Sequence, residues 1–360
     1  MDSLIRNALR EEGDKKDSFS GKDVDQELME VLKGLKTNIT IVGLGGGGGN
    51  TLNRMATVGV KGATLVAANT DAQHLLSVHA DRKVLLGKNL TRGLGAGSKP
   101  EVGEKAAEEA YEQFDALLED QDIVFLTCGL GGGTGTGSIG AIARLAKEKG
   151  ALTIAVMTKP FTSEGKSREQ NALWGIDRLK EYVDTLIVIP NDKLVELYPR
   201  MSLNKAFMIA DEILMRSIKG ITEMITKPGI VNLDYNDLKT VMQGAGMAMV
   251  GMGESTATGD QRALEAIEEA IRSPLLDVDI HGARGALINV TGGNSMTIRE
   301  AELVAEEVEK MISPDAHIIW GCNVDPSLED TLRVMLVTTG IKSKHFIPAE
   351  KKVKKIQRIA

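Results

Sequence analysis

The chain has 360 residues, of which 42% are hydrophobic and 26% are charged, and its formal net charge is −7. These values are ordinary for a soluble globular protein of about two domains. The sequence contains no run of about 18 apolar residues, so no transmembrane helix is expected. The negative net charge argues against nucleic acid as the main partner.

Residues 1–37 are predicted to form an amino-terminal helical extension. Leu28, Val31, Leu32 and Leu35 fall at helical spacing, which indicates an amphipathic helix that is loosely attached rather than part of the core. Acidic residues occur within the first dozen positions and no apolar core follows Met1, so a secretory signal is not expected.

Between residues 38 and 203, short β-branched runs alternate with longer helical patterns. Helical patterns occur at Glu101–Leu118 and Gly140–Lys149. The strand-like runs are Ile39–Val42, Leu65–Ala68, Ile123–Thr127, Ile154–Met157 and Leu186–Ile189. This alternation predicts a doubly wound, Rossmann-like α/β domain with a mostly parallel sheet. Such sheets bind ligands at the loops that leave the carboxyl ends of their strands.

A long central helix is predicted over residues 204–228. Apolar residues recur at three- and four-residue steps from Phe207 to Ile225, and Pro228 and Gly229 end the pattern. About 23 helical residues extend roughly 34 Å, which is enough to cross a domain.

Residues 229–346 are predicted to form a second, smaller α+β domain. Its helical patterns are Asp260–Arg272 and Thr297–Ile312, and the second opens with a capping box of Thr297 and Glu300. Its strand-like runs are Ala286–Thr291, Ala316–Trp320 and Leu332–Val337. Residues 347–360 form a basic tail.

Cysteine and histidine usage gives no sign of a metal or disulfide framework. Cys128 and Cys322 lie far apart in strand-like runs, so buried reduced thiols are expected. The five histidines are scattered, and a metal held only by side chains is not expected.

The first glycine-rich segment, GLGGGGGN at residues 43–50, follows a strand and precedes a helical pattern. That order directs backbone N–H groups and a helix amino terminus toward a phosphate. Gly43, Gly45 and Gly48 also match the dinucleotide fingerprint G-x-G-x-x-G, and the next strand ends near Asp71. Taken alone, this segment leaves a Rossmann-type, dinucleotide-dependent oxidoreductase as an alternative.

The second glycine-rich segment, GGGTGTG at residues 131–137, also leaves a strand and enters a helix. A dinucleotide-binding fold needs one such segment for its pyrophosphate and not a second. GLGAG at residues 93–97 is a third glycine-rich segment. Together they indicate several phosphates bound from more than one side, with Thr134 and Thr136 as hydroxyl donors. No G-x-x-x-x-G-K-[ST] occurs, so the chain is not a P-loop protein. The alternative, that these glycines only form tight turns, leaves their number unexplained.

These segments resemble the tubulin/FtsZ superfamily of GTPases, in order and in spacing. GGGTGTG is similar to the superfamily's signature loop. GLGGGGGN, ANTDAQ at 68–73, GLGAG and IPND at 189–192 resemble FtsZ in particular. SPLLDVDIHGARGALINVTGG at 273–293 resembles the carboxy-terminal domain of FtsZ. The resemblance covers residues 38–340 and implies a GTPase that binds GTP and GDP. Mg²⁺ is then expected on the nucleotide phosphates, with no all-protein metal site.

The resemblance also implies which residues contact the nucleotide. Glu164 and Arg168 would contact it directly, and Asn191 would lie by the ribose or base. The glycine segments and their neighbours would supply Gly46, Gly47, Gly48, Gly49, Asn50, Asp71, Gly95, Ala96, Gly97, Gly132, Gly133, Thr134, Gly135 and Thr136. Without the resemblance, Arg168 would be read as a solvated surface charge.

The base is expected near Phe207 and Asp211, at the start of the central helix. Phe207 can stack on a purine, and the Asp211 carboxylate can accept hydrogen bonds from the guanine N1–H and amino group. Adenine has an acceptor at that ring nitrogen, so a carboxylate there would disfavour ATP. From periodicity alone, Phe207 would instead belong to the apolar stripe of the helix.

Catalytic residues are expected at the other end of that helix. The resemblance implies that Asn232, Asp234 and Asp237 of one subunit complete the nucleotide site of the next, with Asp234 and Asp237 orienting the attacking water. A head-to-tail contact of this kind does not close, so it generates filaments. Taken without the resemblance, Asp234 and Asp237 are an ordinary helix amino terminus, one capping the helix and the other favouring its dipole.

The family implies a cytoplasmic homopolymer that forms the cytokinetic ring at midcell during cell division. A tubulin-like filament for cell shape or DNA partition stays open. A membrane-tethering adaptor is expected, yet the short tail departs from the long linker of bacterial FtsZ. The tail cations could bind an acidic partner or an anionic membrane face, or form a solvated charge run. They are Lys351, Lys352, Lys354, Lys355 and Arg358.

Overall fold

The computed structural model describes residues 37–197, 200–227, 229–231, 233–273, 275 and 280–341. The predicted amino-terminal helix, the basic tail and Asn232 therefore lie outside the described residues. No helix in the described part of the chain is both long and apolar enough to cross a membrane.

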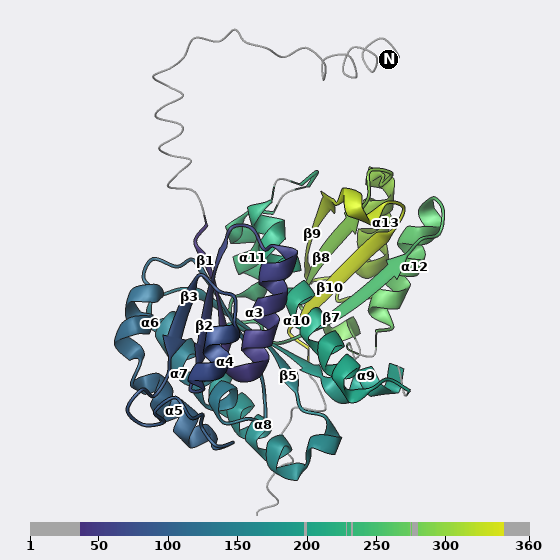
Figure 1. The fold of residues 1–360 in the computed structure, drawn as a ribbon. Helices are drawn as coiled ribbons and strands as arrows, with labels where there is room; N and C mark the ends of the chain where they lie inside the picture. The colour runs from purple at the N-terminus through teal and green to yellow at the C-terminus, as the bar shows by residue number, and fades with distance from the viewer. Residues whose placement is uncertain are drawn as a thin grey trace, which may run out of the picture. The chain divides into compact units, whose positions relative to one another are not determined.

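A mixed sheet of ten strands organises the fold, in the order β3-β2-β1-β4-β5-β6-β7-β10-β8-β9 (Figure 1). Strands β1 to β6 pair in parallel, which confirms the predicted Rossmann-like, mostly parallel sheet. Strand β10 is antiparallel to both β7 and β8. The strands are β1 Ile39–Leu44, β2 Ala63–Asn69, β3 Arg82–Leu85, β4 Ile123–Gly129, β5 Leu152–Lys159, β6 Thr185–Pro190, β7 Gly246–Ser255, β8 Gly285–Gly292, β9 His317–Val324 and β10 Leu332–Thr339.

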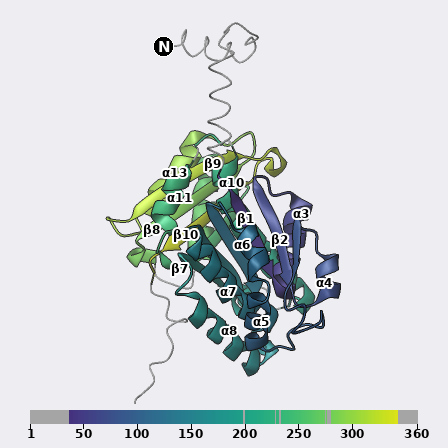
Figure 2. The ribbon, with the colours of Figure 1, turned by 90° about the vertical axis from the view of Figure 1, so that its left-hand side faces the viewer.

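Helices cover both faces of the parallel strands. Helices α3, α4, α10 and α11 pack on one face, and α5 to α8 pack on the other, each over its own buried apolar cluster (Figures 1 and 2). Their bounds are α3 Gly45–Val58, α4 Ala72–Ser77, α5 Pro100–Glu108, α6 Tyr111–Leu117, α7 Thr134–Glu148, α8 Lys166–Leu179, α9 Asn191–Leu197, α10 Leu203–Thr226 and α11 Tyr235–Met242. A 3-10 turn at Thr162–Glu164 precedes α8.

Two helical predictions differ from the structure. The pattern at Glu101–Leu118 forms two helices, because the chain leaves helical geometry at Ala110, where φ is −101° and ψ is 9°. The Glu109 carboxylate at this break accepts a hydrogen bond from the backbone N–H of Asn89, at 2.9 Å. The helix predicted from Gly140 already begins at Thr134, so the second glycine segment is largely the first turn of α7.

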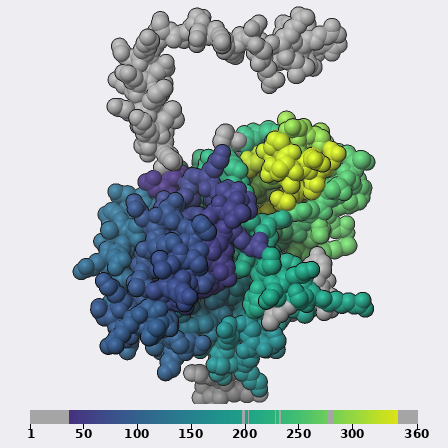
Figure 3. Space-filling view, in the orientation of Figure 1, coloured from purple at the N-terminus to yellow at the C-terminus, as the bar shows by residue number. Residues whose placement is uncertain are grey.

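The carboxy-terminal part adds α12 Asp260–Ile271 and α13 Ile298–Glu309, with 3-10 turns at Ile280–Gly282 and Pro326–Leu328. The two helices share a third buried cluster with β7 to β10. Thr297 and Glu300 form the predicted capping box at the start of α13. In Figure 3 the purple and blue amino-terminal half lies beside the green and yellow carboxy-terminal half.

Helix α10 joins the two halves. Its Ile218 and Ile221 are fully buried in the same cluster as Ile41 of β1 and Val337 of β10. The sheet is also continuous across the halves, because Thr185, at the start of β6, pairs with Gly246, at the start of β7. Cys128 and Cys322 are buried free thiols, and burial raises the pKa of each.

Candidate nucleotide-binding site

The two glycine-rich segments meet at the carboxyl ends of neighbouring strands. Strands β1 and β4 lie side by side with Leu44 opposite Cys128. Helix α3 follows β1 directly, and α7 follows β4 after the four-residue turn 130–133. A Cβ on Gly45 would lie 2.8 Å from the backbone nitrogen of Gly135, so only glycine allows the two helix starts to pack this closely. Two sets of unpaired helix N–H groups therefore converge, which is a strong arrangement for binding an anion.

A cavity of about 400 Å³ opens in front of these helix starts. It brings together residues from β4, β5, α3, α7, α8, α9 and α10 that are far apart in the sequence. Predicted nucleotide-binding residues in its wall are Gly46, Gly47, Asn50, Gly132, Gly133, Thr134, Gly135, Glu164, Arg168, Asn191, Phe207 and Asp211. Gly129, Leu130, Thr158, Pro160 and Ala210 also line it and were not predicted.

Two threonines of the signature segment have different surroundings. Thr134 lines the cavity, and its hydroxyl is 2.6 Å from the hydroxyl of Thr70, which directly follows β2. The hydroxyl of Thr136 accepts a hydrogen bond from the backbone N–H of Gly131, at 2.9 Å, and the residue is 1% exposed. Thr136 therefore holds the turn in shape from behind and does not line the cavity.

Six other predicted residues also lie outside the cavity wall. Gly48 and Gly49 are buried where α3 packs on its neighbours, and a Cβ on Gly48 would lie 2.5 Å from the carbonyl oxygen of Thr127. Asp71 caps α4 by accepting a hydrogen bond from the backbone N–H of His74, at 3.0 Å.

The segment with Gly95, Ala96 and Gly97 runs beside the cavity instead of lining it. The N–H of Gly95 donates to the carbonyl of Thr70, at 3.1 Å, which ties the segment to the end of β2. Ala96 lies against Gly133, because a Cβ on Gly133 would be 2.9 Å from the Ala96 methyl.

The far end of the cavity is suited to an aromatic ring with polar edges. Phe207 is 37% exposed, and Phe161 supports it edge to face, with ring centroids 5.1 Å apart at 85°. Asn191 is 3% exposed, and its buried Oδ1 has no hydrogen-bond partner among the described residues. Because an unpaired buried acceptor is costly, Oδ1 is available to a ligand donor.

Asp211 is the acidic group of this end. Burial raises the pKa of its carboxyl to about 6, and the nearby positive charge of Arg54 opposes the rise. A desolvated carboxyl with no strong partner is available to pair with donors of a bound ring.

A charged pair forms one side of the cavity. Arg168 Nη1 lies 2.6 Å from Glu164 Oε2, and the other carboxylate oxygen of Glu164 accepts from the backbone N–H of Phe161. The amine of Lys159 lies 3.4 Å from a carboxylate oxygen of Glu169 and is not in the cavity wall.

Asp234 and Asp237 do not reach this cavity. Both are exposed at the start of α11, after the end of the 24-residue helix α10, whose first turns carry Phe207 and Asp211. They form a reciprocal capping box. Asp234 Oδ1 accepts from the N–H of Asp237 at 2.8 Å, and Asp237 Oδ2 accepts from the N–H of Asp234 at 3.2 Å. A helix of that length extends about 36 Å, so these carboxylates cannot act on a ligand of their own cavity.

Within the described ranges, no three His, Cys, Asp or Glu side chains come together in a way that could hold a metal ion.

Comparison with known proteins assigns both halves of the chain. Residues 38–199 match the model of the Tubulin/FtsZ family GTPase domain, and residues 246–342 match that of the FtsZ family C-terminal domain. The chain is 53% identical to cell division protein FtsZ 1 of Archaeoglobus fulgidus, over 96% of this chain and 95% of that one. It is 50% identical to cell division protein FtsZ 1 of Methanocaldococcus jannaschii, over 98% of each. A solved structure of the empty FtsZ dimer of M. jannaschii superposes with a TM-score of 0.85 at 52% identity, over 90% of this chain and 93% of that one.

Proposed function

This chain belongs to the FtsZ family of tubulin-like GTPases, and from that premise we propose that GTP occupies the 400 Å³ cavity. The chain is a GTPase that assembles into filaments. The observation that carries the proposed site is the meeting of two helix amino termini, at Gly45 and Thr134, in one cavity wall. Backbone N–H groups of Gly46, Gly47, Gly132 and Gly133 would hold the phosphates.

The base would lie at the opposite end of the cavity. Phe207 offers a ring face for stacking, and the carboxylate of Asp211 accepts from the guanine N1–H and amino group. Asn191 Oδ1 offers a further acceptor to the base or ribose. Adenine would leave the Asp211 carboxylate facing another acceptor, and that mismatch would favour GTP over ATP.

Mg²⁺ would arrive with the nucleotide and be held mainly by its phosphate oxygens. The wall next to the helix starts offers backbone N–H groups and the hydroxyls of Thr134 and Thr158 but no carboxylate cluster. These neutral groups fit an ion that is carried by phosphate. Bound there, Mg²⁺ would neutralise charge that develops on the phosphates during hydrolysis.

Hydrolysis would require a second copy of the chain. The exposed carboxylates of Asp234 and Asp237 lie beyond the far end of α10, so a head-to-tail contact would bring them to the γ-phosphate of the next subunit. Asn232 would accompany them there. The capping box fixes both carboxylates in place, which suits groups that orient a water molecule.

We assign the filament to cell division, because relatives at about half identity over nearly the full length carry that name. Its site of action would be the cytoplasm at midcell, with a membrane-tethering adaptor as partner. In this proposal residues 38–203 bind GTP, 204–228 form the central helix and 229–346 form the carboxy-terminal domain. A filament for cell shape or DNA partition is the alternative.

A mixing experiment tests the shared site. Asp237→Ala has an intact nucleotide cavity but a defective catalytic loop, whereas Asp211→Asn has an impaired cavity but an intact loop. With Mg²⁺ and a GTP concentration that saturates the parent but not Asp211→Asn, each variant alone should be nearly inactive, and an equimolar mixture should regain activity well above the sum of the two. A mixture that only equals the sum would show that the loop does not act on a neighbouring subunit.

A further inference from the structure

A second cavity, of about 240 Å³, lies on the face covered by α5 to α8, behind the turn that Thr136 holds. Its floor includes the small residues Gly137, Gly140 and Ala141 of α7. We call it the α7 groove. The proposed nucleotide site uses none of its other lining residues, so its chemistry is unassigned.

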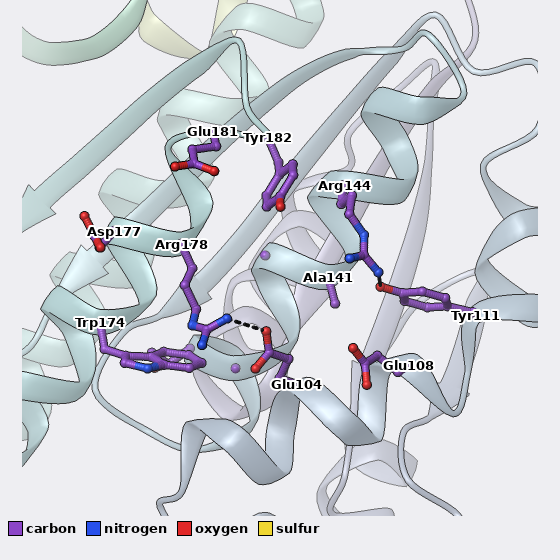
Figure 4. A pocket seen from close by; sticks show the side chains of 13 residues that line it. Glu104, Glu108, Tyr111, Ala141, Arg144, Trp174, Asp177, Arg178, Glu181 and Tyr182 are labelled. Atoms are coloured by element: carbon purple, nitrogen blue, oxygen red, sulfur yellow. Dashed lines mark hydrogen bonds and ion pairs between the residues drawn. The ribbon is translucent and has the colours of Figure 1, made fainter.

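The walls of the α7 groove are aromatic rings with arginines fixed on them (Figure 4). On one side, the guanidinium of Arg178 lies 4.4 Å from the centroid of the Trp174 ring, and its Nη1 donates to Glu104 at 3.0 Å. On the other side, Arg144 donates to the hydroxyl of Tyr111, with its guanidinium 5.5 Å from that ring. Both cations are therefore already paired within the walls.

The α7 groove is lined by more carboxylates than arginines. Glu108 and Glu181 are exposed on opposite sides, and neither makes a hydrogen bond or ion pair with a described residue. The stretch 100–120, which forms one wall, carries a single cation, Lys105. Its carboxylates are Glu101, Glu104, Glu108, Glu109, Glu112, Asp115, Glu119 and Asp120. A segment that places cations at the rim and apolar side chains against the rings would match this groove.

We propose that residues 351–358 of the same chain, KKVKKIQR, dock in the α7 groove. This segment has five cations and no acid, which complements the acidic rim. Val353 and Ile356 are three residues apart and could cover the half-buried rings of Trp174 and Tyr182 while lysines reach Glu108 and Glu181. The groove then holds the basic tail against the GTPase domain and withdraws it from other anionic surfaces.

The end of the described chain is close enough for this contact. Thr339, two residues before the last described position, pairs with Ala248 near the start of β7, and Gly246 pairs with Thr185 at the start of β6. Neighbouring strands are about 5 Å apart, and Tyr182 in the groove wall is only three residues before Thr185. The nine residues 342–350 can span up to about 30 Å, so the tail can reach the groove of its own subunit.

A spin label on the tail tests the proposal in the full chain. Trp320→Phe leaves Trp174 as the remaining tryptophan, and Gln357→Cys adds an accessible thiol beside the buried Cys128 and Cys322. A nitroxide on Cys at position 357 quenches Trp174 on contact. Without nucleotide, we expect Trp174 emission to fall by about half or more relative to the reduced label, independently of protein concentration.

Salt and charge variants identify the groove as the docking site. Emission should recover in about 0.5 M NaCl, and also at low salt after Glu108→Gln with Glu181→Gln. The matched control, Glu302→Gln with Glu309→Gln on exposed positions of α13, should leave the quenching unchanged.

Three results would overturn the proposal. The first is full emission at low salt, with the chain sedimenting instead on phosphatidylserine vesicles, which would assign the tail to an anionic membrane face. The second is quenching that the groove variant and its control affect equally. The third is quenching that increases with protein concentration, which would place the tail on a second copy.

Discussion

Arg54 of α3 donates a hydrogen bond to Glu212 of α10 at 2.9 Å, and so links the helix of the first glycine segment to the residue beside Asp211. Further ion pairs extend from Glu212 into the carboxy-terminal half. Glu212 binds Arg216 at 2.7 Å, and the carboxylate of Glu254 on β7 accepts from Arg216 at 2.6 Å and from Arg333 on β10 at 2.7 Å. A continuous network of charges thus connects the nucleotide cavity with the second half of the chain.

Glu254→Gln should destabilise the protein at neutral pH. It leaves the guanidiniums of Arg216 and Arg333 without their shared carboxylate, and the free energy of unfolding should fall by about 1 kcal/mol, because solvent screens this half-exposed network. Urea unfolding measures the difference. Glu268→Gln, which breaks the more exposed pair with Arg272, is the control and should cost less. Equal losses would show that the network is no more than a set of surface pairs.

The effect of Glu254→Gln should also depend on pH. Burial opposes ionisation of Glu254, but hydrogen bonds and charge from Arg333, with help from Arg216, hold its pKa below the ordinary 4.5. A lowered pKa in the folded state stabilises the protein above the unfolded value and loses that effect as pH falls through the folded value. The variant and the parent should therefore differ most above pH 4.5 and converge in stronger acid.

Asp211→Asn should change the base that the protein binds. The side-chain amide can accept from the N1–H of xanthine and donate to its C2 carbonyl, whereas the guanine amino group would face a donor. Affinity for GTP should fall about 30- to 100-fold, and affinity for XTP should rise correspondingly. Equilibrium titration with both nucleotides measures this, with the exposed Asp177→Asn as control. Unchanged GTP affinity would remove Asp211 from the base site.

The raised pKa of Asp211 predicts how GTP binding depends on pH. In the nucleotide-free protein its pKa is about 6, so a growing fraction of the carboxyl is protonated below that pH and cannot accept from guanine. The ratio of GTP affinities of the parent and of Asp211→Asn should therefore decline toward one between pH 7.5 and 5. Taking the ratio cancels titration of the phosphates, which both proteins share. A constant ratio would mean that the carboxylate does not bind the base.

Protonation of Asp211 should stabilise the folded protein, whereas protonation of Glu254 should destabilise it. A folded-state pKa raised from 3.8 to about 6 means that ionised Asp211 costs stability, and the stability gained by protonation appears as pH falls through 6. Without nucleotide, Asp211→Asn should accordingly unfold at a higher temperature than the parent at pH 7.5, and the gap should narrow below pH 6. A variant that is less stable at pH 7.5 would contradict this.

Asp237→Ala should separate catalysis from binding. GTP affinity should stay within about twofold, because the carboxylate is remote from its own cavity, while the steady-state GTPase rate should fall at least 100-fold. The substitution also removes half of a capping box, at a cost of about 1 kcal/mol. Thr297→Ala, in the capping box of α13, is the matched control and should cost similar stability without loss of activity. Loss of GTP binding in folded Asp237→Ala would refute the assignment.

Sequence patterns predicted the parts of the fold that periodicity encodes. The apolar stripe from Phe207 to Ile225 predicted α10 to within two residues at its carboxyl end, and the β-branched runs located β1, β2, β4, β5 and β6. Strand β7 was missed because its sequence, GMAMVGMGES, has a single β-branched residue, Val250, and β3 because it has four residues at a sheet edge.

Long-range contacts in the site could not be read from local sequence. The glycine segments predicted converging backbone donors, but the direction of the Thr136 hydroxyl follows from its bond to Gly131 within the folded turn. Phe161 packs against Phe207, 46 positions away in the sequence, and no periodic pattern of apolar residues around Phe161 predicts this contact. The pairing of Arg178 with Glu104 depends likewise on how α5 and α8 pack against α7.

The most direct test of a shared, interfacial active site is the GTPase rate per subunit as a function of protein concentration, with Mg²⁺ present and light scattering recorded in parallel. We predict a rate near zero below a threshold concentration that rises together with scattering above it. A constant rate per subunit with no scattering would contradict an active site completed by a neighbouring subunit.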